Sequence, residues 1–297
     1  MAFDSAVESP IEPPLEPALE PALEREYNLR IRHPERDDVY RSFAARSAEW
    51  YARSGGLRDQ RYGAGPRCLI DFFPARRSEE PSPLLVFIHG GYWRALSKDL
   101  FAFIAEPYTE AGLGVALLGY DLAPTVTLTQ IAAQVEQAMS WLGRSAQTLG
   151  VRRDAVVLSG HSAGGHLSGV LAGRSPEQLG GLRIQGVAAI SGVFDLNPLL
   201  QTSVNRDVRM TQDEADTLSP LGFTRFEPSR FVLAVGGLET EGFKQQSRRF
   251  AQRLRSLGRE ADEMEVEGRT HFDVLEDLGR ADSPLFRAVC GLLPERA

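Results

Sequence analysis

Short apolar runs alternate along the chain with longer segments of helical periodicity. The runs lie at residues 84–88, 114–118, 155–158, 185–190 and 231–235. Between them are segments such as 128–142, in which Leu128, Ile131 and Val135 fall on one helical face. Continuous apolar strands alternating with amphipathic helices are typical of a mostly parallel sheet covered on both faces. The pattern therefore predicts an α/β fold.

Weaker signals extend this sheet at both ends. Residues 68–73 and 264–266 are also expected to form strands, and the charged segment 34–53, with aromatic residues at helical intervals, predicts a helix lying against the main body. Helical sequence follows the strand at 231–235, with Gly258 as a stop signal, and resumes near the C-terminal end.

Two segments interrupt the alternation. Residues 1–25 contain a four-residue Glu/Pro/Ala/Leu repeat, and its recurring proline excludes a continuous helix. We expect a disordered tail there, and a docking motif is the less favoured alternative. Residues 194–230 are polar and irregular, as expected for a small cap inserted over one edge of the sheet, either a lid or a long insertion. Residues 26–297 are predicted to form a single domain.

Composition narrows the class of protein. The 297 residues are 42% hydrophobic and 25% charged, which is ordinary for a globular protein, and the net charge of −7 disfavours a nucleic-acid partner. No apolar run approaches the roughly 18 residues of a membrane span, and the N-terminal residues are acidic, unlike a signal peptide. We therefore expect a cytoplasmic protein without membrane contact. Cys68 and Cys290 are isolated and are expected to be reduced.

The clearest chemical signal is Gly160-His161-Ser162-Ala163-Gly164, between the strand at 155–158 and a helical segment. Gly-x-Ser-x-Gly at such a junction is the nucleophile elbow of α/β-hydrolases, in which a tight turn presents the serine hydroxyl. We therefore predict an α/β-hydrolase fold with Ser162 as nucleophile. A serine needs a base, an orienting acid and an oxyanion hole.

His271 is the predicted base. In α/β-hydrolases the partners follow the nucleophile in the order Ser, Asp or Glu, His, and of the five histidines only His271 lies beyond the last predicted strand. His33 precedes the core, His89 and His161 lie in the two glycine motifs, and His166 on the elbow helix is expected to pack or to support the site.

Glu239 is the favoured acid because it lies three residues beyond Gly236, where a predicted strand ends. Glu241 and Asp195 are the alternatives. Glu241 fits the first turn of the following helix, where a carboxylate is favoured by the helix dipole without any catalytic role.

The oxyanion hole is predicted from two places. The residue after the nucleophile, Ala163, provides one backbone N–H, and the glycine turn after an earlier strand, Gly90 and Gly91, provides another. The sequence contains no metal-ligand motif and no phosphate-binding or dinucleotide fingerprint, so we expect neither a metal nor a cofactor.

Several motifs together resemble the kynurenine formamidase (arylformamidase) branch of the α/β-hydrolases. They are His89-Gly90-Gly91-Tyr92-Trp93, residues 119–124, residues 160–165, residues 191–196, Ser219-Pro220, residues 239–247 and His271-Phe272, within a likeness running from Glu26 to Leu278. The resemblance implies a metal-independent serine hydrolase that removes formate from N-formyl-L-kynurenine in tryptophan catabolism, with Ser162, Glu239 and His271 as its triad. The family's acid is often Asp, so Glu239 departs from the pattern.

The expected ligand is a small aromatic amide or ester. Tyr92, Trp93, Phe194 and Phe272 are candidates to bracket its ring, with core packing as the alternative for all four. A carboxylesterase or amidase of another pathway, including secondary metabolism, would share the same triad. A non-catalytic binding protein of the same fold is less favoured because no triad member is missing. The oligomeric state stays open, with a homodimer as one alternative.

Overall fold

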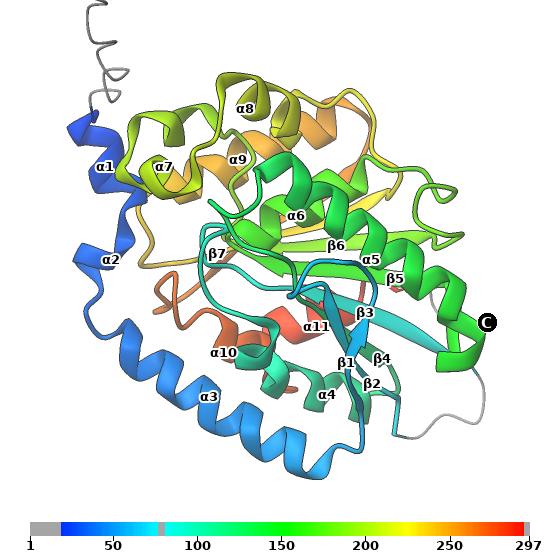
Figure 1. The fold of residues 1–297 in the computed structure, drawn as a ribbon. Helices are drawn as coiled ribbons and strands as arrows, with labels where there is room; N and C mark the ends of the chain where they lie inside the picture. The colour runs from blue at the N-terminus through cyan, green and yellow to red at the C-terminus, as the bar shows by residue number, and fades with distance from the viewer. Residues whose placement is uncertain (1–18, 77–80, 294–297) are drawn as a thin grey trace, which may run out of the picture.

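The computed structural model describes residues 19–76 and 81–293, which form an eight-stranded sheet between two layers of helices (Figure 1). The strands are β1 (Leu57–Arg61), β2 (Leu69–Phe73), β3 (Ser82–Ile88), β4 (Gly114–Leu118), β5 (Val151–His161), β6 (Ile184–Ile190), β7 (Arg230–Gly236) and β8 (Glu260–Val266). Their spatial order is β1-β2-β4-β3-β5-β6-β7-β8.

The sheet is parallel from β4 to β8, which confirms the prediction from the apolar runs. Only β1 and β2 are antiparallel to their neighbours. The sequence analysis missed β1 because its residues, Leu-Arg-Asp-Gln-Arg, lie largely exposed at the edge of the sheet and show no apolar run.

Helices cover both faces. They are α1 (Pro21–Tyr27), α2 (Leu29–Arg32), α3 (Arg36–Arg53), α4 (Ala105–Glu110), α5 (Leu128–Leu149), α6 (Ala163–Ala172), α7 (Ser203–Val208), α8 (Gln212–Leu218), α9 (Glu241–Ser256), α10 (Leu275–Leu278) and α11 (Pro284–Cys290), with 3₁₀ turns η1 (Lys98–Ile104), η2 (Asn197–Gln201) and η3 (Pro220–Gly222). The predicted helix at 34–53 is confirmed as α3.

Alternate residues of β3 serve two hydrophobic cores. Val86 and Ile88 face the core shared with α5, α6 and α9, and Leu85 and Phe87 face the core shared with α3, α4, α10 and α11. Because side chains alternate along a strand, a continuous apolar run is what a sheet buried on both faces requires. Within the described residues, no helix is both long and apolar enough for a membrane span.

Residues 21–25 are not part of a disordered tail, because α1 begins at Pro21. The Glu20 carboxylate accepts a hydrogen bond from the Ala22 amide at 2.7 Å and caps the helix, and Glu24 accepts one from the Ser203 hydroxyl at 2.5 Å. The proline that excludes a helix interior is favourable at the first helical position. Of the rest of the predicted tail, residues 1–18 lie outside the described residues.

The last residues of α1 attach to two other segments. The Glu26 carbonyl accepts a hydrogen bond from Thr240 Oγ1 at 2.8 Å, and the Glu26 carboxylate accepts one from the Gly242 amide at 2.6 Å. The Tyr27 carbonyl accepts one from the Tyr92 hydroxyl, also at 2.6 Å. In Figure 1 this segment lies beside α7, and α2 leads from it into α3.

Residues 194–230 contain the short helical elements η2, α7, α8 and η3, joined by irregular chain. Buried polar groups anchor the segment. The Gln246 side-chain oxygen accepts a hydrogen bond from the Phe194 amide at 2.9 Å, and His166 Nε2 donates to the Leu218 carbonyl at 2.8 Å. Whether the segment acts as a lid stays a prediction.

Candidate active site

Ser162 lies in the tight turn between β5 and α6, with φ 55° and ψ −116°. A non-glycine residue rarely adopts a positive φ, and at a functional site this marks stored strain. The flanking glycines make the turn sterically feasible. A Cβ on Gly164 would lie 1.9 Å from the Ile88 carbonyl oxygen, and one on Gly160 would lie 2.2 Å from the Gly164 carbonyl oxygen. The elbow predicted from the motif is therefore present in the backbone.

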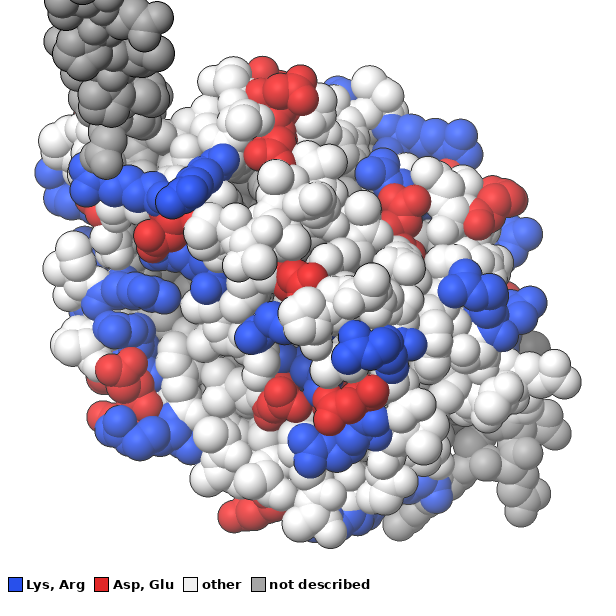
Figure 2. All heavy atoms as spheres, viewed as in Figure 1, with Lys and Arg blue, Asp and Glu red and all other residues white. Residues whose placement is uncertain are grey.

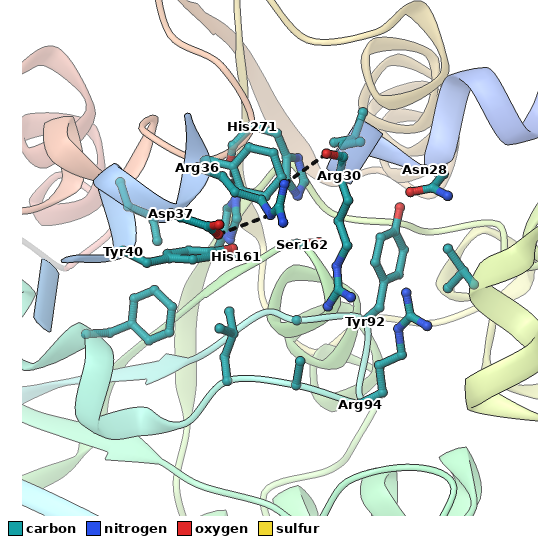
Figure 3. A pocket seen from close by; sticks show the side chains of 18 residues that line it. Asn28, Arg30, Arg36, Asp37, Tyr40, Tyr92, Arg94, His161, Ser162 and His271 are labelled. Atoms are coloured by element: carbon teal, nitrogen blue, oxygen red, sulfur yellow. Dashed lines mark hydrogen bonds and ion pairs between the residues drawn. The ribbon is translucent and has the colours of Figure 1, made fainter. Parts of the chain in front are cut away.

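Ser162 and His271 line one cavity of about 330 Å³, shown in Figure 3. This volume lies at the lower end of small-molecule sites, roughly 300–1,000 Å³. Gly91, Tyr92 and Phe272 line the same cavity.

Glu239 and His271 form a buried pair. His271 Nδ1 lies 2.7 Å from Glu239 Oε2, with 5% and 0% of the two side chains exposed. The other carboxylate oxygen, Oε1, accepts hydrogen bonds from the Ser191 hydroxyl at 2.5 Å and the Gly236 amide at 2.7 Å. These contacts use most of the acceptor positions of the ionised Glu239 carboxylate. They hold the carboxylate with Oε2 toward the imidazole.

Neither alternative acid contacts His271. Glu241 is the first residue of α9 and pairs with Arg248 at 2.7 Å. Asp195 pairs with Arg249 at 3.0 Å. Among the described residues, no hydrogen bond joins the Ser162 hydroxyl to His271, and such catalytic contacts are often long before substrate binds.

His161 ties the elbow to the loop that carries His271. Its Nε2 lies 2.8 Å from the His271 carbonyl oxygen, and the two rings lie 4.7 Å apart. Burial, together with the neighbouring His271, lowers the pKa of His161 well below its usual value. The ring is therefore neutral with its proton on Nε2, since that nitrogen faces an acceptor. The sequence analysis placed His161 within a glycine motif and missed this contact.

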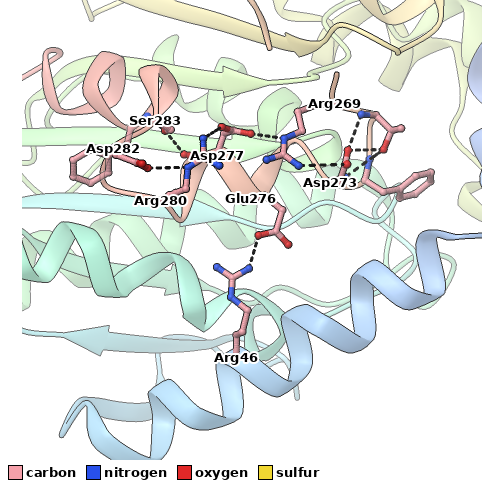
Figure 4. A network of polar contacts seen from close by, with 11 residues as sticks. Arg46, Arg269, Asp273, Glu276, Asp277, Arg280, Asp282 and Ser283 are labelled. Carbon is pink, nitrogen blue, oxygen red and sulfur yellow. Dashed lines mark hydrogen bonds and ion pairs between the residues drawn. The ribbon is translucent and has the colours of Figure 1, made fainter. Parts of the chain in front are cut away.

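A polar network braces the same loop from the other side (Figure 4). The Asp273 carboxylate accepts hydrogen bonds from the Thr270 amide at 2.6 Å and hydroxyl at 2.7 Å. Arg269 Nε donates to Asp277 at 2.5 Å, and Arg280 bonds the other oxygen of Asp277 at 2.9 Å. His271 therefore occupies a loop fixed on both sides.

The glycine turn after β3 approaches the elbow closely. A Cβ on Gly90 would lie 3.1 Å from Ser162 Cβ, and Gly91 has φ 109°, with a Cβ there 2.3 Å from the Ala95 carbonyl oxygen. Gly91 lines the pocket, whereas Gly90 does not. Ala163 is the first residue of α6, so its N–H has no acceptor within the helix.

His89 supports this turn. Its Nδ1 lies 2.7 Å from the Gly90 carbonyl oxygen, and its ring stacks on Tyr120 at 4.3 Å. Burial lowers the pKa of His89 to about 4, so it is neutral at pH 7. The same is true of His166, whose pKa burial also lowers to about 4. Neither ring lines the pocket.

The four predicted aromatic contacts divide into two pairs. Tyr92 and Phe272 line the pocket, but Trp93 and Phe194 are fully buried elsewhere. Trp93 packs edge-on against His166 at 5.1 Å, and Phe194 stacks on Phe250 at 4.1 Å. Trp93 and Phe194 thus belong to the hydrophobic core, and neither lines the pocket.

The N-terminal helices supply a pocket wall that the sequence analysis missed. Asn28, Leu29 and Arg30 reach the cavity from α2 and its N-cap, and Arg36 and Tyr40 reach it from α3. The only available signal was the expectation that 34–53 packs on the main body. No local motif marks these residues as pocket-lining.

One group of acidic side chains has metal-like spacing among the described residues: Asp59, Asp71 and Asp99. The Lys98 ammonium lies within 2.8–2.9 Å of all three carboxylates. A lysine ammonium therefore already bonds all three carboxylates, and the group does not line the Ser162 pocket.

Comparison with known proteins agrees with this geometry. The BD-FAE family matches residues 70–218. The kynurenine formamidase of Danio rerio is 31% identical over 253 residues, covering 82% of this chain and 85% of that protein, and the Drosophila melanogaster kynurenine formamidase is 30% identical, covering 76% and 78%.

Among solved structures, a Silicibacter sp. TM1040 protein provisionally assigned as a thioesterase superposes with a TM-score of 0.77 at 30% identity, over 86% of this chain and 93% of that one. The α/β-hydrolase fold predicted from the elbow is thereby confirmed, and the chain is a hydrolase. With relatives this similar over most of their length, the chain belongs to the kynurenine formamidase family.

Proposed function

We propose that this hydrolase cleaves N-formyl-L-kynurenine to L-kynurenine and formate, without a metal, through a formyl-enzyme on Ser162. The observation that carries the proposal is the buried Glu239–His271 pair at the pocket that Ser162 lines. The family membership adds the substrate: two curated relatives are kynurenine formamidases.

In the first half-reaction, Ser162 Oγ attacks the formyl carbon while its proton passes to His271 Nε2. Glu239 holds the imidazole with its proton on Nδ1, which leaves Nε2 free to act as the base, and stabilises the imidazolium that forms. The carbon–nitrogen bond then breaks, His271 gives its proton to the aniline nitrogen, and L-kynurenine leaves.

In the second half-reaction, water attacks the formyl ester and transfers a proton to His271, which returns it to Ser162 Oγ as formate departs. The amides of Gly91 and Ala163 are the proposed donors to the oxyanion in both steps, with Gly90 keeping the turn close to Ser162. Tyr92 and Phe272 line the space assigned to the aromatic ring.

The decisive measurement is kcat/KM of the purified protein on N-formyl-L-kynurenine beside p-nitrophenyl acetate, with and without a chelator. We expect a formamide value of about 10⁴ M⁻¹s⁻¹ or higher, within the ordinary range for a dedicated enzyme, unaffected by the chelator. Turnover of the ester alone would move the assignment to an esterase or amidase of another pathway, and turnover of neither would favour a binding protein.

Ser162→Ala should lower kcat/KM by about 10⁴-fold or more, because no other group supplies the nucleophile. Ser159→Ala is the matched control: Ser159 is buried on β5, three residues earlier, and its hydroxyl has no partner among the described residues. An active Ser162→Ala protein would refute the mechanism. A cytoplasmic location and a homodimer stay predictions from the sequence.

A further inference from the structure

The pocket carries an excess of positive charge. Arg30, Arg36 and Arg94 line it, and Asp37 is the one carboxylate among its lining residues. The chain as a whole has the opposite balance, with 33 Lys and Arg against 40 Asp and Glu. Figure 2 shows basic and acidic side chains interspersed over one face of the molecule, so the cationic pocket is a local feature.

Arg94 lies at the pocket with one of its hydrogen-bond donors unpaired within the described chain. Its Nη1 pairs with Asp207 of α7, and only 12% of its side chain is exposed. Its Nε is buried and has no hydrogen-bond partner among the described residues. A buried N–H without an acceptor is costly, and a ligand oxygen would remove that cost.

Arg30 reaches the pocket from α2, and its guanidinium has no ion-pair or hydrogen-bond partner in the described part of the chain. Figure 3 shows its side chain directed into the pocket, toward Ser162 and Tyr92. Burial, and then the charge of Arg30, lower the pKa of Arg94. The two guanidinium groups thus interact unfavourably, although Arg94 is paired with Asp207.

Arg36 differs from these two. Its Nη1 donates to the Arg30 carbonyl at 2.9 Å and the His33 carbonyl at 3.1 Å, and its Nε lies 3.5 Å from Asp37. Its guanidinium is therefore bonded to the backbone of the segment that carries Arg30.

We infer that Arg30 and Arg94 form a subsite for a carboxylate on the leaving-group side of the substrate. Guanidinium groups bind carboxylates through paired, charge-assisted hydrogen bonds. The inference rests on the proposed function, since the amino-acid side chain of N-formyl-L-kynurenine ends in such a carboxylate. It defines the substrate class as aryl formamides that carry an anionic tail.

The test compares N-formyl-L-kynurenine with N-formylkynurenamine, which lacks only the carboxylate. We expect the protein to prefer the former by about tenfold or more in kcat/KM, as one charge-assisted contact provides. Arg30→Gln and Arg94→Gln should each reduce this preference toward one, through KM rather than kcat. Arg32→Gln is the matched control, because Arg32 lies on α2 without lining the pocket.

An unchanged preference in Arg30→Gln, or an equal loss on both substrates, would overturn the subsite while leaving the formamidase proposal intact. Calorimetry of the binding of L-kynurenine and kynurenamine tests the subsite separately from the formamidase proposal, because binding is measured without turnover. If neither formamide is hydrolysed, the proposed function fails. The subsite would still be supported if the protein binds L-kynurenine more tightly than kynurenamine and Arg30→Gln abolishes this difference. Equal binding of both amines would overturn it.

Discussion

The Ser162 side of the pocket and the Arg30 side are built in different ways. On the first, β5, the elbow and α6 are consecutive in sequence, and the contacts that fix His271 and Glu239 are buried. On the second, α2 and the start of α3 line the pocket, and hydrogen bonds at Glu26, Tyr27 and Arg36 hold this segment in place. The comparison separates a reaction centre specified by local motifs from a binding wall specified by distant contacts.

If this division is correct, changes on the Ser162 side should act on kcat and changes on the Arg30 side on KM. Three sets of substitutions test it, beginning with the largest expected effect.

Glu239→Gln should lower kcat by about 10²–10⁴-fold. A glutamine can donate to His271 Nδ1 and so favours the tautomer with its proton on Nε2, which cannot accept the proton of Ser162. Asp195→Asn is the control, because Asp195 pairs with Arg249 and has no contact with His271. Equal losses in the two variants would contradict the assignment of Glu239 as the acid.

Phe194→Ala should lower the free energy of unfolding by about 3–5 kcal/mol, as expected for truncating a fully buried phenylalanine. Phe272→Ala, at the pocket, should instead raise KM. Urea denaturation and steady-state kinetics on both variants would check the division between core and pocket aromatics. A raised KM in Phe194→Ala with unchanged stability would return Phe194 to the substrate site.

Tyr92→Phe removes the hydroxyl that donates to the Tyr27 carbonyl at 2.6 Å. The loss of about 1 kcal/mol for such a bond should raise KM roughly fivefold, by loosening the wall, with little change in kcat. Tyr62→Phe removes a similar bond, to the Gly119 carbonyl at 2.6 Å within the core. It should lower stability without changing KM. Identical behaviour of the two variants would mean that the N-terminal segment is not a separate element of the site.

Sequence alone predicted the elements whose own residues determine their backbone structure. The apolar runs predicted β3 to β7 in part or whole, because strands buried on both faces must be apolar. Weaker signals added β2 and the last residues of β8, which is largely polar and exposed. The Gly-x-Ser-x-Gly motif predicted the elbow because only glycine tolerates the approaches at Gly160 and Gly164.

The same reasoning failed where position depends on contacts distant in sequence. Tyr92 and Trp93 are neighbours, both with positive φ, yet one lines the pocket and the other packs against His166. The proline repeat suggested a tail up to residue 25, but capping by Glu20 and bonding to Ser203 make residues 21–25 a helix. Arg30 carries no local signal, because an exposed arginine on a short helix is ordinary in any surface.

The hydrogen bonds at Glu26 have a consequence for engineering new specificities. Thr240 and Gly242 lie one and three residues after Glu239, so the segment that leads into the binding wall is bonded to the chain beside the proposed acid. A wall transplanted from a relative with another substrate must bring a compatible partner for residues 240–242. Otherwise the graft disturbs the start of α9 and, through it, the carboxylate that orients His271. Substrate specificity and turnover thus depend on the same contacts, and the N-terminal helices cannot be exchanged without regard to residues 240–242.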